Sequence, residues 1–269
     1  MSNIMNKKYF FLGGMFRSGN TVLSSILNQN PTLYVSPLSP VVEYMWQCDI
    51  CNLESSQIYA NKHSKKNVIS KIIENFYEDI DKPIIIDRSK TWAIPENILM
   101  IKKYITTKPK IIFTIRPLHE SIASHINIMK LHLLSEMARH SFSYNKDISE
   151  NDNIAEFLLS GNDYALHSLS HSSYIEDTNK KILHIVKFED LINDPNKTLK
   201  NIYDFLEIKN YSHDFKNIKK EKEKLSILST LPKDLHKVDK RLKDSELDVK
   251  DILSKTMIEK CKKIDLFYN

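Results

Sequence analysis

The stretch FFLGGMFRSGNTVLSSILNQNP, residues 10–31, constrains the fold of this chain more than any other segment. An apolar strand runs into a loop that holds three of the chain's four glycines, Gly13, Gly14 and Gly19. An amphipathic helix then begins near Thr21. A strand, a glycine loop and a helix N-terminus in this order form an anion site, because free backbone N–H groups and the positive end of the helix dipole face the loop.

The spacing from Gly14 to Gly19 is that of a phosphate-binding P-loop. A P-loop has a lysine directly after its second glycine, but here Asn20 takes that position and Arg17 lies inside the loop. P-loop kinases and NTPases use the lysine on the β- and γ-phosphates and need an acid for Mg²⁺. Asp87 could supply that acid, so a kinase or NTPase remains an alternative, with the missing lysine as evidence against it.

The composition favours a globular protein that binds an anion. The 269 residues are 41% hydrophobic, and the formal net charge is +5. This charge is too weak and dispersed to predict a nucleic-acid partner. No segment approaches the roughly 18 apolar residues that a membrane span needs, and the N-terminus lacks the apolar run of a signal peptide. We therefore expect no membrane partner and a cytoplasmic location.

Cysteine usage does not indicate a disulfide framework. The chain has three cysteines, of which Cys48 and Cys51 form a lone CxxC. No second pair of cysteines or histidines completes a tetrahedral zinc site, so we expect no metal. The role of the Cys48/Cys51 pair is left open.

Strand-like runs alternate with helical patterns along most of the chain. Apolar, β-branched runs predict four strands, at 9–12, 83–87, 110–115 and 182–188. Helical periodicity predicts helices at 21–29, 41–48, 64–77, 94–104, 118–134, 154–170 and from Asp194 to about 206. The alternation predicts an α/β, P-loop-like three-layer fold, with a central, mainly parallel sheet flanked by helices.

We expect a single domain over residues 1–269. Its C-terminal part, about 214–269, is helical and rich in charge. This part is interpreted as a solvated helical region, with a lid as the alternative. Ligands of such sheets bind beyond the C-terminal ends of the strands, where the loops of interest fall.

A second candidate anion site follows the third predicted strand. Arg116 ends the strand, Pro117 opens a helix, and Ser124 comes eight residues after the arginine, a little over two helical turns. An arginine and a hydroxyl on one helix face could grip a second phosphate. The alternative is an arginine paired with the helix acid Glu120, beside an ordinary serine.

Three ordered blocks resemble the sulfotransferases that use 3′-phosphoadenylyl sulfate (PAPS). The loop FRSGNTVLSSILNQNP is similar to their 5′-phosphosulfate loop, IRPLHESIASHI to their 3′-phosphate motif, and HIVKFEDLINDPNKTLKNIYDFLEI to a segment that reads YEDL…DP…TL. The match is to the bacterial and tyrosylprotein-like branch, and it covers about Lys8 to Ile208. Phe16 departs from that branch's usual proline before the loop arginine.

The resemblance implies in-line transfer of a sulfonate from PAPS to an acceptor hydroxyl, with 3′,5′-ADP as product and no metal. It implies that the 5′-phosphosulfate is held by Arg17, Ser18, Gly19, Asn20 and Thr21. Arg116 and Ser124 would hold the 3′-phosphate, and Lys237, in a late HKV element, is a further candidate nucleotide contact.

The residues that would act on the transferring sulfonate are less clear. The stretch DRSKTW resembles the family's DK.R.W, with Arg88 in place of its lysine and Lys90 in place of its arginine. Both keep the charge, but their hydrogen-bonding geometries differ, so the choice between them stays open. Arg17 would help either of them neutralise the sulfonate.

The general base is expected to be Glu43. The related branch uses a glutamate shortly after the loop helix, and Glu43 is the first acid after that helix here. An acid beside aromatic residues can act as a base, but an acid in a first helical turn also stabilises its own helix. His119 and His125 are the rival bases, with His125 interpreted as structural.

The acceptor cannot be read from the sequence. A peptide tyrosine, a sugar and a small molecule are all compatible with the motifs, and the oligomeric state is left open, a homodimer being one option. The alternative functions are a P-loop-type kinase or NTPase and a non-catalytic nucleotide-binding protein.

Overall fold

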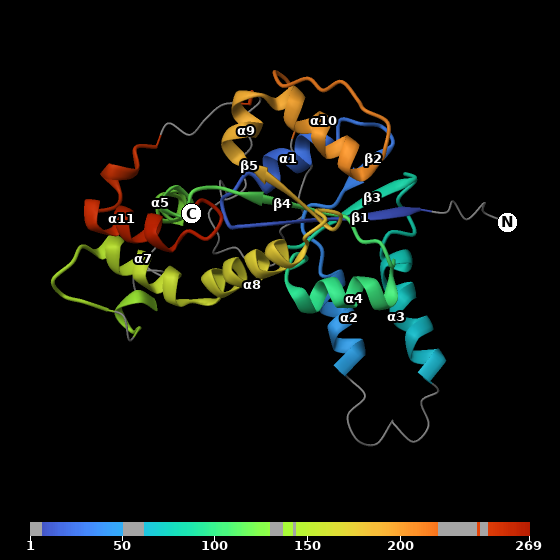
Figure 1. Ribbon diagram of the computed structural model, residues 1–269, viewed down its shortest axis with the longest axis horizontal. Coiled ribbons are helices and arrows are strands. Elements are labelled where there is room, and N and C mark those ends of the chain that lie inside the picture. Colours follow the sequence, from blue (N-terminus) through green and yellow to red (C-terminus); the bar gives the residue numbers. More distant parts are fainter. Residues whose placement is uncertain (1–6, 51–61, 130–136, 142–143, 220–240, 243–246) are drawn as a thin grey trace.

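A five-stranded, fully parallel sheet organises the chain (Figure 1). The structure is a computed structural model that describes residues 7–50, 62–129, 137–141, 144–219, 241–242 and 247–269. The strand order is β2-β3-β1-β4-β5. The strands are β1 (Lys8–Gly14), β2 (Leu33–Val35), β3 (Ile84–Arg88), β4 (Ile111–Ile115) and β5 (Leu183–Lys187).

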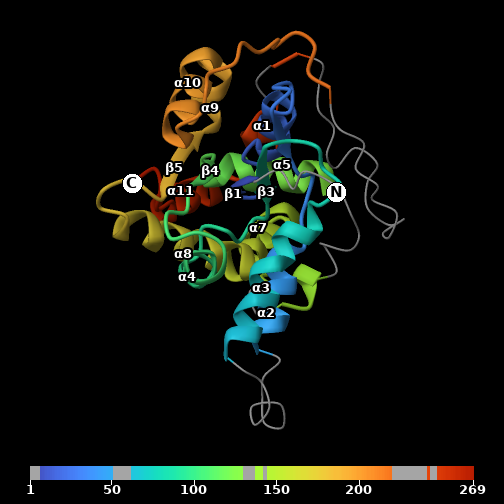
Figure 2. The same cartoon turned by 90° about the vertical axis from the view of Figure 1, so that its right-hand side faces the viewer.

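Helices cover both faces of this sheet, which confirms the predicted three-layer α/β fold (Figures 1 and 2). One face carries α1 (Asn20–Leu27), α9 (Phe188–Asn193) and α10 (Pro195–Leu206). The larger group of helices packs into the core of the other face. It comprises α2 (Val41–Ile50), α3 (Lys62–Phe76), α4 (Pro95–Tyr104), α5 (Leu118–Met129), α7 (Glu150–Ser160), α8 (Asn162–Glu176) and α11 (Lys255–Ile264), with a short 3₁₀ turn, η1 (Val249–Asp251).

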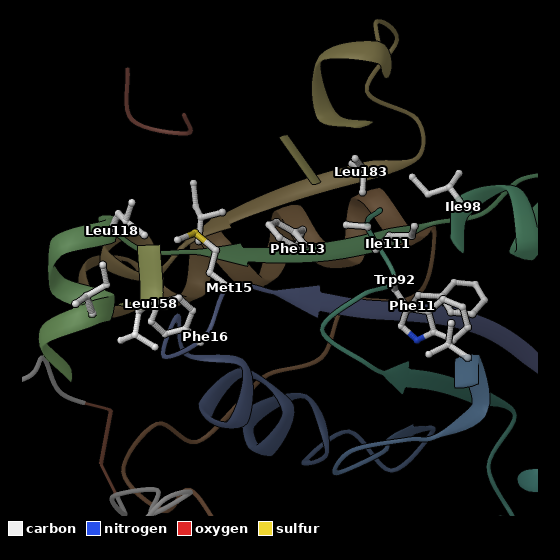
Figure 3. Packing of buried hydrophobic residues seen from close by; sticks show 14 of the residues in the cluster. Phe11, Met15, Phe16, Trp92, Ile98, Ile111, Phe113, Leu118, Leu158 and Leu183 are labelled. Carbon is white, nitrogen blue, oxygen red and sulfur yellow. The ribbon is translucent and has the colours of Figure 1, made fainter. Parts of the chain in front are cut away.

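The strands separate two hydrophobic cores because successive side chains point to opposite faces. In β1, Phe10 and Leu12 belong to the core under α1 and α10, whereas Phe11 belongs to the core under the larger helical layer. Figure 3 shows this second core, where Phe11 stacks near Trp92 at a ring-centroid distance of 4.7 Å. A strand buried on both faces explains why the sequence shows a continuous apolar run.

The four predicted strands are confirmed, and β2 was missed. Its three residues are too few to show a period in the sequence. The structure makes β2 a strand through its pairing with β3, in which Leu33 to Val35 lie beside Ile84 to Ile86. The short strand therefore forms only because a longer one lies next to it.

The single helix predicted at 154–170 is wrong. The chain forms two helices there, α7 and α8, separated by Gly161, whose backbone is extended at φ −94° and ψ −173°. The Ser149 side chain accepts a hydrogen bond from the Asp152 N–H and begins α7 earlier than predicted. The predicted N-cap of α10 is confirmed, since the Asp194 side chain accepts from the Lys197 N–H.

The C-terminal residues 247–269 pack into the body of the molecule. Leu253, Met257 and Cys261 are buried in the core that contains Phe11, and α11 lies beside α5 at the end of the sheet away from the N-terminus (Figure 1). Residues 220–240 and 243–246 of the segment interpreted as a solvated helix or lid lie outside the described residues, and Lys237 is among them.

Candidate active site

The predicted anion-binding loop connects β1 to α1 at the C-terminal edge of the sheet, next to β4. A Cβ atom added at Gly14 would lie 2.2 Å from Thr114 Oγ1 and 2.4 Å from Asn20 Nδ2, so only glycine fits there. Gly19 has φ +90°, a conformation that favours glycine, and a Cβ there would lie 2.4 Å from Phe188 Cδ2. Both glycines are therefore required by tertiary neighbours as well as by the turn.

Hydrogen bonds inside the loop fix its shape. The Ser18 hydroxyl donates to the Met15 carbonyl at 2.6 Å and lies 2.6 Å from Thr114 Oγ1. Asn20 Nδ2 donates to the same Met15 carbonyl at 3.3 Å, and its Oδ1 atom is buried with no hydrogen-bond partner among the described residues. The side chains of Ser18 and Asn20 thus organise the loop, which leaves its backbone N–H groups as the means of holding an anion.

Arg17 and Ser124 come together across 107 residues of sequence. Arg17 Nε donates to Ser124 Oγ at 3.3 Å. Burial lowers the pKa of Arg17, and the positive charge of Arg116 lowers that pKa further, so the two guanidinium groups lie within electrostatic range of each other. The Ser121 hydroxyl also donates to the Phe16 carbonyl, which ties α5 to the loop. A buried and a half-buried guanidinium near a helix N-terminus form a strong anion site.

Arg116 pairs with Glu120, which is the alternative that the sequence analysis set against a phosphate grip. Its Nε donates to Glu120 Oε2 at 3.0 Å, and its side chain is only 8% exposed. Its Cζ atom also lies 4.9 Å from the centroid of the Phe188 ring. The structure therefore holds the Arg116 guanidinium between a carboxylate and an aromatic face, within electrostatic range of Arg17.

Arg88 and Lys90 have different surroundings in the structure. Arg88 is 7% exposed, and its guanidinium lies 3.4 Å from both Ser24 Oγ and Thr21 Oγ1 at the start of α1. Lys90 has a half-exposed side chain, and its Nζ lies 3.9 Å from Asp163 Oδ1. Of the two cations, Arg88 reaches the anion-binding end of α1.

Glu43 is exposed in the first turn of α2. The segment that leads into this helix is tied to the end of β3, because the Ser39 N–H donates to the Arg88 carbonyl at 2.9 Å and the Arg88 N–H donates to Ser36 Oγ at 2.8 Å. Burial raises the pKa of Asp87, and the negative charge of Glu43 raises it further. Glu43 is thus anchored close to the strand end that carries Arg88.

Asp87 is a structural residue of the core. It is fully buried, and its two oxygens accept hydrogen bonds from the Tyr77 hydroxyl at 2.6 Å and from Trp92 Nε1 at 2.7 Å. Burial raises the pKa of the Asp87 carboxyl. Both oxygens are already occupied, so Asp87 does not suit the role of a Mg²⁺-binding acid.

The rival histidines occupy half-buried positions on α5. Burial lowers the pKa of His119 and lowers that of His125 to about 4, so both rings are neutral at neutral pH. His125 packs edge-on against Phe16, with ring centroids 5.3 Å apart, and Asp163, Lys90 and Arg17 are its charged neighbours. His125 supports the wall beside the loop, in line with its structural interpretation.

Sequence reasoning missed the residues that join the two anion sites. Phe188, the first residue of α9, contacts both Gly19 and Arg116. Thr114 in β4 holds Ser18. Neither belongs to a recognisable anion motif, although Phe188 follows the end of a predicted strand, where ligand-binding loops of parallel sheets occur.

Among the described residues, no group of three or more His, Cys, Asp or Glu side chains could hold a metal ion. Cys48 is exposed with a free thiol, and Cys51 lies outside the described residues, so the structure does not test the pair. None of the described helices combines the length and apolar character of a membrane span.

Comparisons with known proteins agree with this geometry. Residues 10–213 match the sequence profile described as the sulfotransferase family. A search of curated protein sequences found no match. The fold is similar to the sulfotransferase domain of the olefin synthase from Synechococcus PCC 7002, with a TM-score of 0.51 and 15% identity over 96% of this chain and 94% of that one. It is also similar to mouse sulfotransferase SULT7A1 complexed with PAP, with a TM-score of 0.52 and 16% identity over 97% of this chain and 83% of that one.

Proposed function

This chain belongs to the sulfotransferase family, and from that premise we propose how its residues transfer a sulfonate from PAPS to an acceptor hydroxyl. The observation that carries the proposal is the meeting of Arg17, Arg116 and Ser124 beside the β1–α1 loop. Two guanidinium groups and a hydroxyl at a helix N-terminus suit a ligand with two separate phosphate groups.

The β1–α1 loop fits a 5′-phosphosulfate. Gly14 and Gly19 admit no side chain, so backbone N–H groups from Arg17 to Thr21 can approach the anion closely. Ser18 and Asn20 serve this site by fixing the loop through Met15 and Thr114. The loop binds through its backbone and needs no lysine.

Arg116 and Ser124 form the grip for the 3′-phosphate. Arg17 links this grip to the loop through its hydrogen bond to Ser124. Glu120 partly neutralises the Arg116 guanidinium. A 3′-phosphate would therefore add charge-assisted hydrogen bonds to a guanidinium that is already oriented.

Arg88 is assigned to the transferring sulfonate and Lys90 to the rim of the site. The Arg88 guanidinium lies beside Thr21 at the helix end that faces the loop, whereas the half-exposed Lys90 side chain lies near Asp163. Negative charge grows on the bridging oxygen as its bond to sulfur breaks. A buried guanidinium close to that oxygen stabilises the transition state more strongly than an exposed ammonium does.

Glu43 is assigned as the general base. Its carboxylate takes the proton of the acceptor hydroxyl as the new oxygen–sulfur bond forms. The old sulfur–oxygen bond breaks, and its electron pair remains on the phosphate oxygen held by the loop. The nucleotide product is 3′,5′-ADP, and no step calls for a metal. The acceptor is a hydroxyl compound, with peptide, sugar and small-molecule alcohols to be distinguished by screening with labelled PAPS.

Ligand-dependent melting tests the nucleotide class directly. We expect 3′,5′-ADP to raise the melting temperature more than ATP with Mg²⁺ does, because the site has two separate grips and no P-loop lysine. Stabilisation by ATP–Mg²⁺ with no response to 3′,5′-ADP would contradict the proposal and favour a kinase or NTPase. Binding of 3′,5′-ADP with no turnover of PAPS against any hydroxyl acceptor would instead favour a non-catalytic nucleotide-binding protein.

A further inference from the structure

The last residues of the chain reach the starts of two helices that frame Arg116. We call residues Asp265–Tyr268, which follow α11, the C-terminal clamp. In Figure 1 the C-terminus lies beside α5 and α11, at the same end of the molecule as the C-terminal ends of β4 and β1. The clamp contains one carboxylate and two aromatic rings, each with a specific partner.

Asp265 holds the start of α5. Its side chain is 2% exposed, and its Oδ2 accepts a hydrogen bond from the Leu118 N–H at 2.6 Å. Leu118 is the first residue of α5 and comes two residues after Arg116, with Pro117 between them. The first N–H groups of a helix have no partner within the helix, so a carboxylate from elsewhere fixes where α5 begins.

Phe267 and Leu266 anchor the clamp to the layer beneath the sheet. The Phe267 ring lies 5.7 Å from the ring of Phe113 in β4 and 5.1 Å from that of His167 in α8, measured between centroids. The Leu266 N–H donates to His167 Nε2 at 3.3 Å, so this imidazole is neutral and accepts the bond. These contacts fix the backbone between Asp265 and Tyr268, and so restrict where the two side chains can lie.

Tyr268 holds the start of α9. Its hydroxyl donates to Glu189 Oε2 at 2.9 Å, and Lys187 Nζ lies 5.0 Å from the centroid of its ring. Glu189 is the direct neighbour of Phe188. The Phe188 ring in turn faces the Arg116 guanidinium and abuts Gly19. Tyr268 therefore restrains the backbone that carries the aromatic face beneath Arg116.

We propose that the C-terminal clamp positions Arg116 for the 3′-phosphate, through Asp265 at α5 and Tyr268 at α9. This inference rests on the proposed role of Arg116. Asp265 fixes the backbone that carries Arg116, and Tyr268 fixes the ring against which its side chain lies. The 5′ loop also has internal hydrogen bonds, from Ser18 and Asn20 to the Met15 carbonyl, so the clamp acts more strongly on the 3′-phosphate grip than on the loop.

The test compares two nucleotides that differ only in the 3′-phosphate, 3′,5′-ADP and 5′-AMP, by titration calorimetry. Tyr268→Phe removes one hydroxyl, and Asp265→Asn removes one negative charge. We expect each variant to lower the affinity for 3′,5′-ADP by about three- to thirtyfold, because the guanidinium loses its fixed geometry. The affinity for 5′-AMP should change by less than about twofold, because the loop fixes its own shape.

The matched control is Asp194→Asn. Asp194 caps α10, where its Oδ1 accepts from the Lys197 N–H at 3.1 Å, and its hydrogen bonds among the described residues go to Lys197, Thr198 and Asp190. Like Asp265→Asn, this variant removes one negative charge at a helix start and keeps an acceptor oxygen, and its ratio of the two affinities should equal that of the wild type.

The titrations distinguish the positioning role of the clamp from the proposed role of Arg116. An unchanged affinity ratio in folded Tyr268→Phe would overturn the positioning role, even if Asp265→Asn fails to fold. Equal losses for both nucleotides would also overturn it, because they would indicate general destabilisation. A wild-type protein that binds 3′,5′-ADP no better than 5′-AMP would instead contradict the proposed function of Arg116 itself.

Discussion

The two anion sites of this protein are built in different ways. The β1–α1 loop is held mainly by residues close to one another in sequence, with Ser18 and Asn20 both bonded to the Met15 carbonyl. The site around Arg116 instead depends on Arg17, Ser124 and Phe188, from three separate segments. A local site can be recognised as a motif, whereas a site gathered from distant segments depends on the packing of helices α5 and α9.

The largest expected effect is a loss of turnover on replacing Glu43, a residue that belongs to neither anion site. Glu43→Gln keeps the size of the side chain but removes the base, so turnover with PAPS should fall by about 10²–10⁴-fold. Affinity for 3′,5′-ADP should stay within about twofold, because Glu43 lies on α2, outside both sites. Steady-state kinetics and calorimetry on the same variant separate the two quantities. Retained turnover would assign the base to another residue.

Gly19→Ala should break both anion sites at once. The left-handed backbone and the clash with Phe188 should lower the free energy of unfolding by about 2–4 kcal/mol, as measured by urea denaturation. Gly161→Ala is the matched control, since its backbone is extended and the new Cβ would lie 3.2 Å from the Phe157 carbonyl oxygen. Equal losses in the two variants would show that Phe188 does not constrain Gly19.

Arg116→Ala should affect only the site gathered from distant segments. Loss of the charged contact with a 3′-phosphate should weaken binding of 3′,5′-ADP by about 2–3 kcal/mol and leave 5′-AMP nearly unaffected. Arg139→Ala is a suitable control, because Arg139 is exposed and pairs with Glu150 at the surface. Unchanged calorimetric affinity in Arg116→Ala would remove the assignment of this arginine.

The smallest expected effect is a loss of folding stability at acid pH, carried by two histidines that pack beside the two sites. His125 supports the loop and His167 supports the C-terminal clamp, and burial lowers the pKa of each to about 4 in the folded state. The unfolded chain takes up these protons near its ordinary pKa of about 6.5, so it binds more protons than the fold between those values. Stability is complete above about pH 6.5 and should fall toward pH 4 by about 1–2 kcal/mol for each ring. Denaturant titrations across this range should show a shallower slope for His125→Gln than for the wild type. An identical slope would mean that His125 does not carry the effect.

The β1–α1 loop could be predicted from the sequence. The order strand, glycine loop and helix requires only neighbours in the chain, so Gly14, Gly19 and the start of α1 could be predicted from their spacing. Arg116 and Ser124 were also predicted from their spacing, because Arg116 ends a strand and Ser124 lies about two helical turns further along. Phe188 and Asp265 could not be found in this way, since each acts on a segment far from it in sequence.

The sequence by itself determined the parallel α/β fold and the two anion-binding motifs. Apolar strand runs, helical periods and glycines act over a few residues, and these local preferences survive in most tertiary settings. The tertiary structure alone decided that β2 is a strand, that Gly161 divides one predicted helix into two, and that Arg88 rather than Lys90 reaches α1. It also brought the C-terminal clamp to the starts of α5 and α9. These features depend on which segments become neighbours after folding, and no short stretch of sequence contains that information.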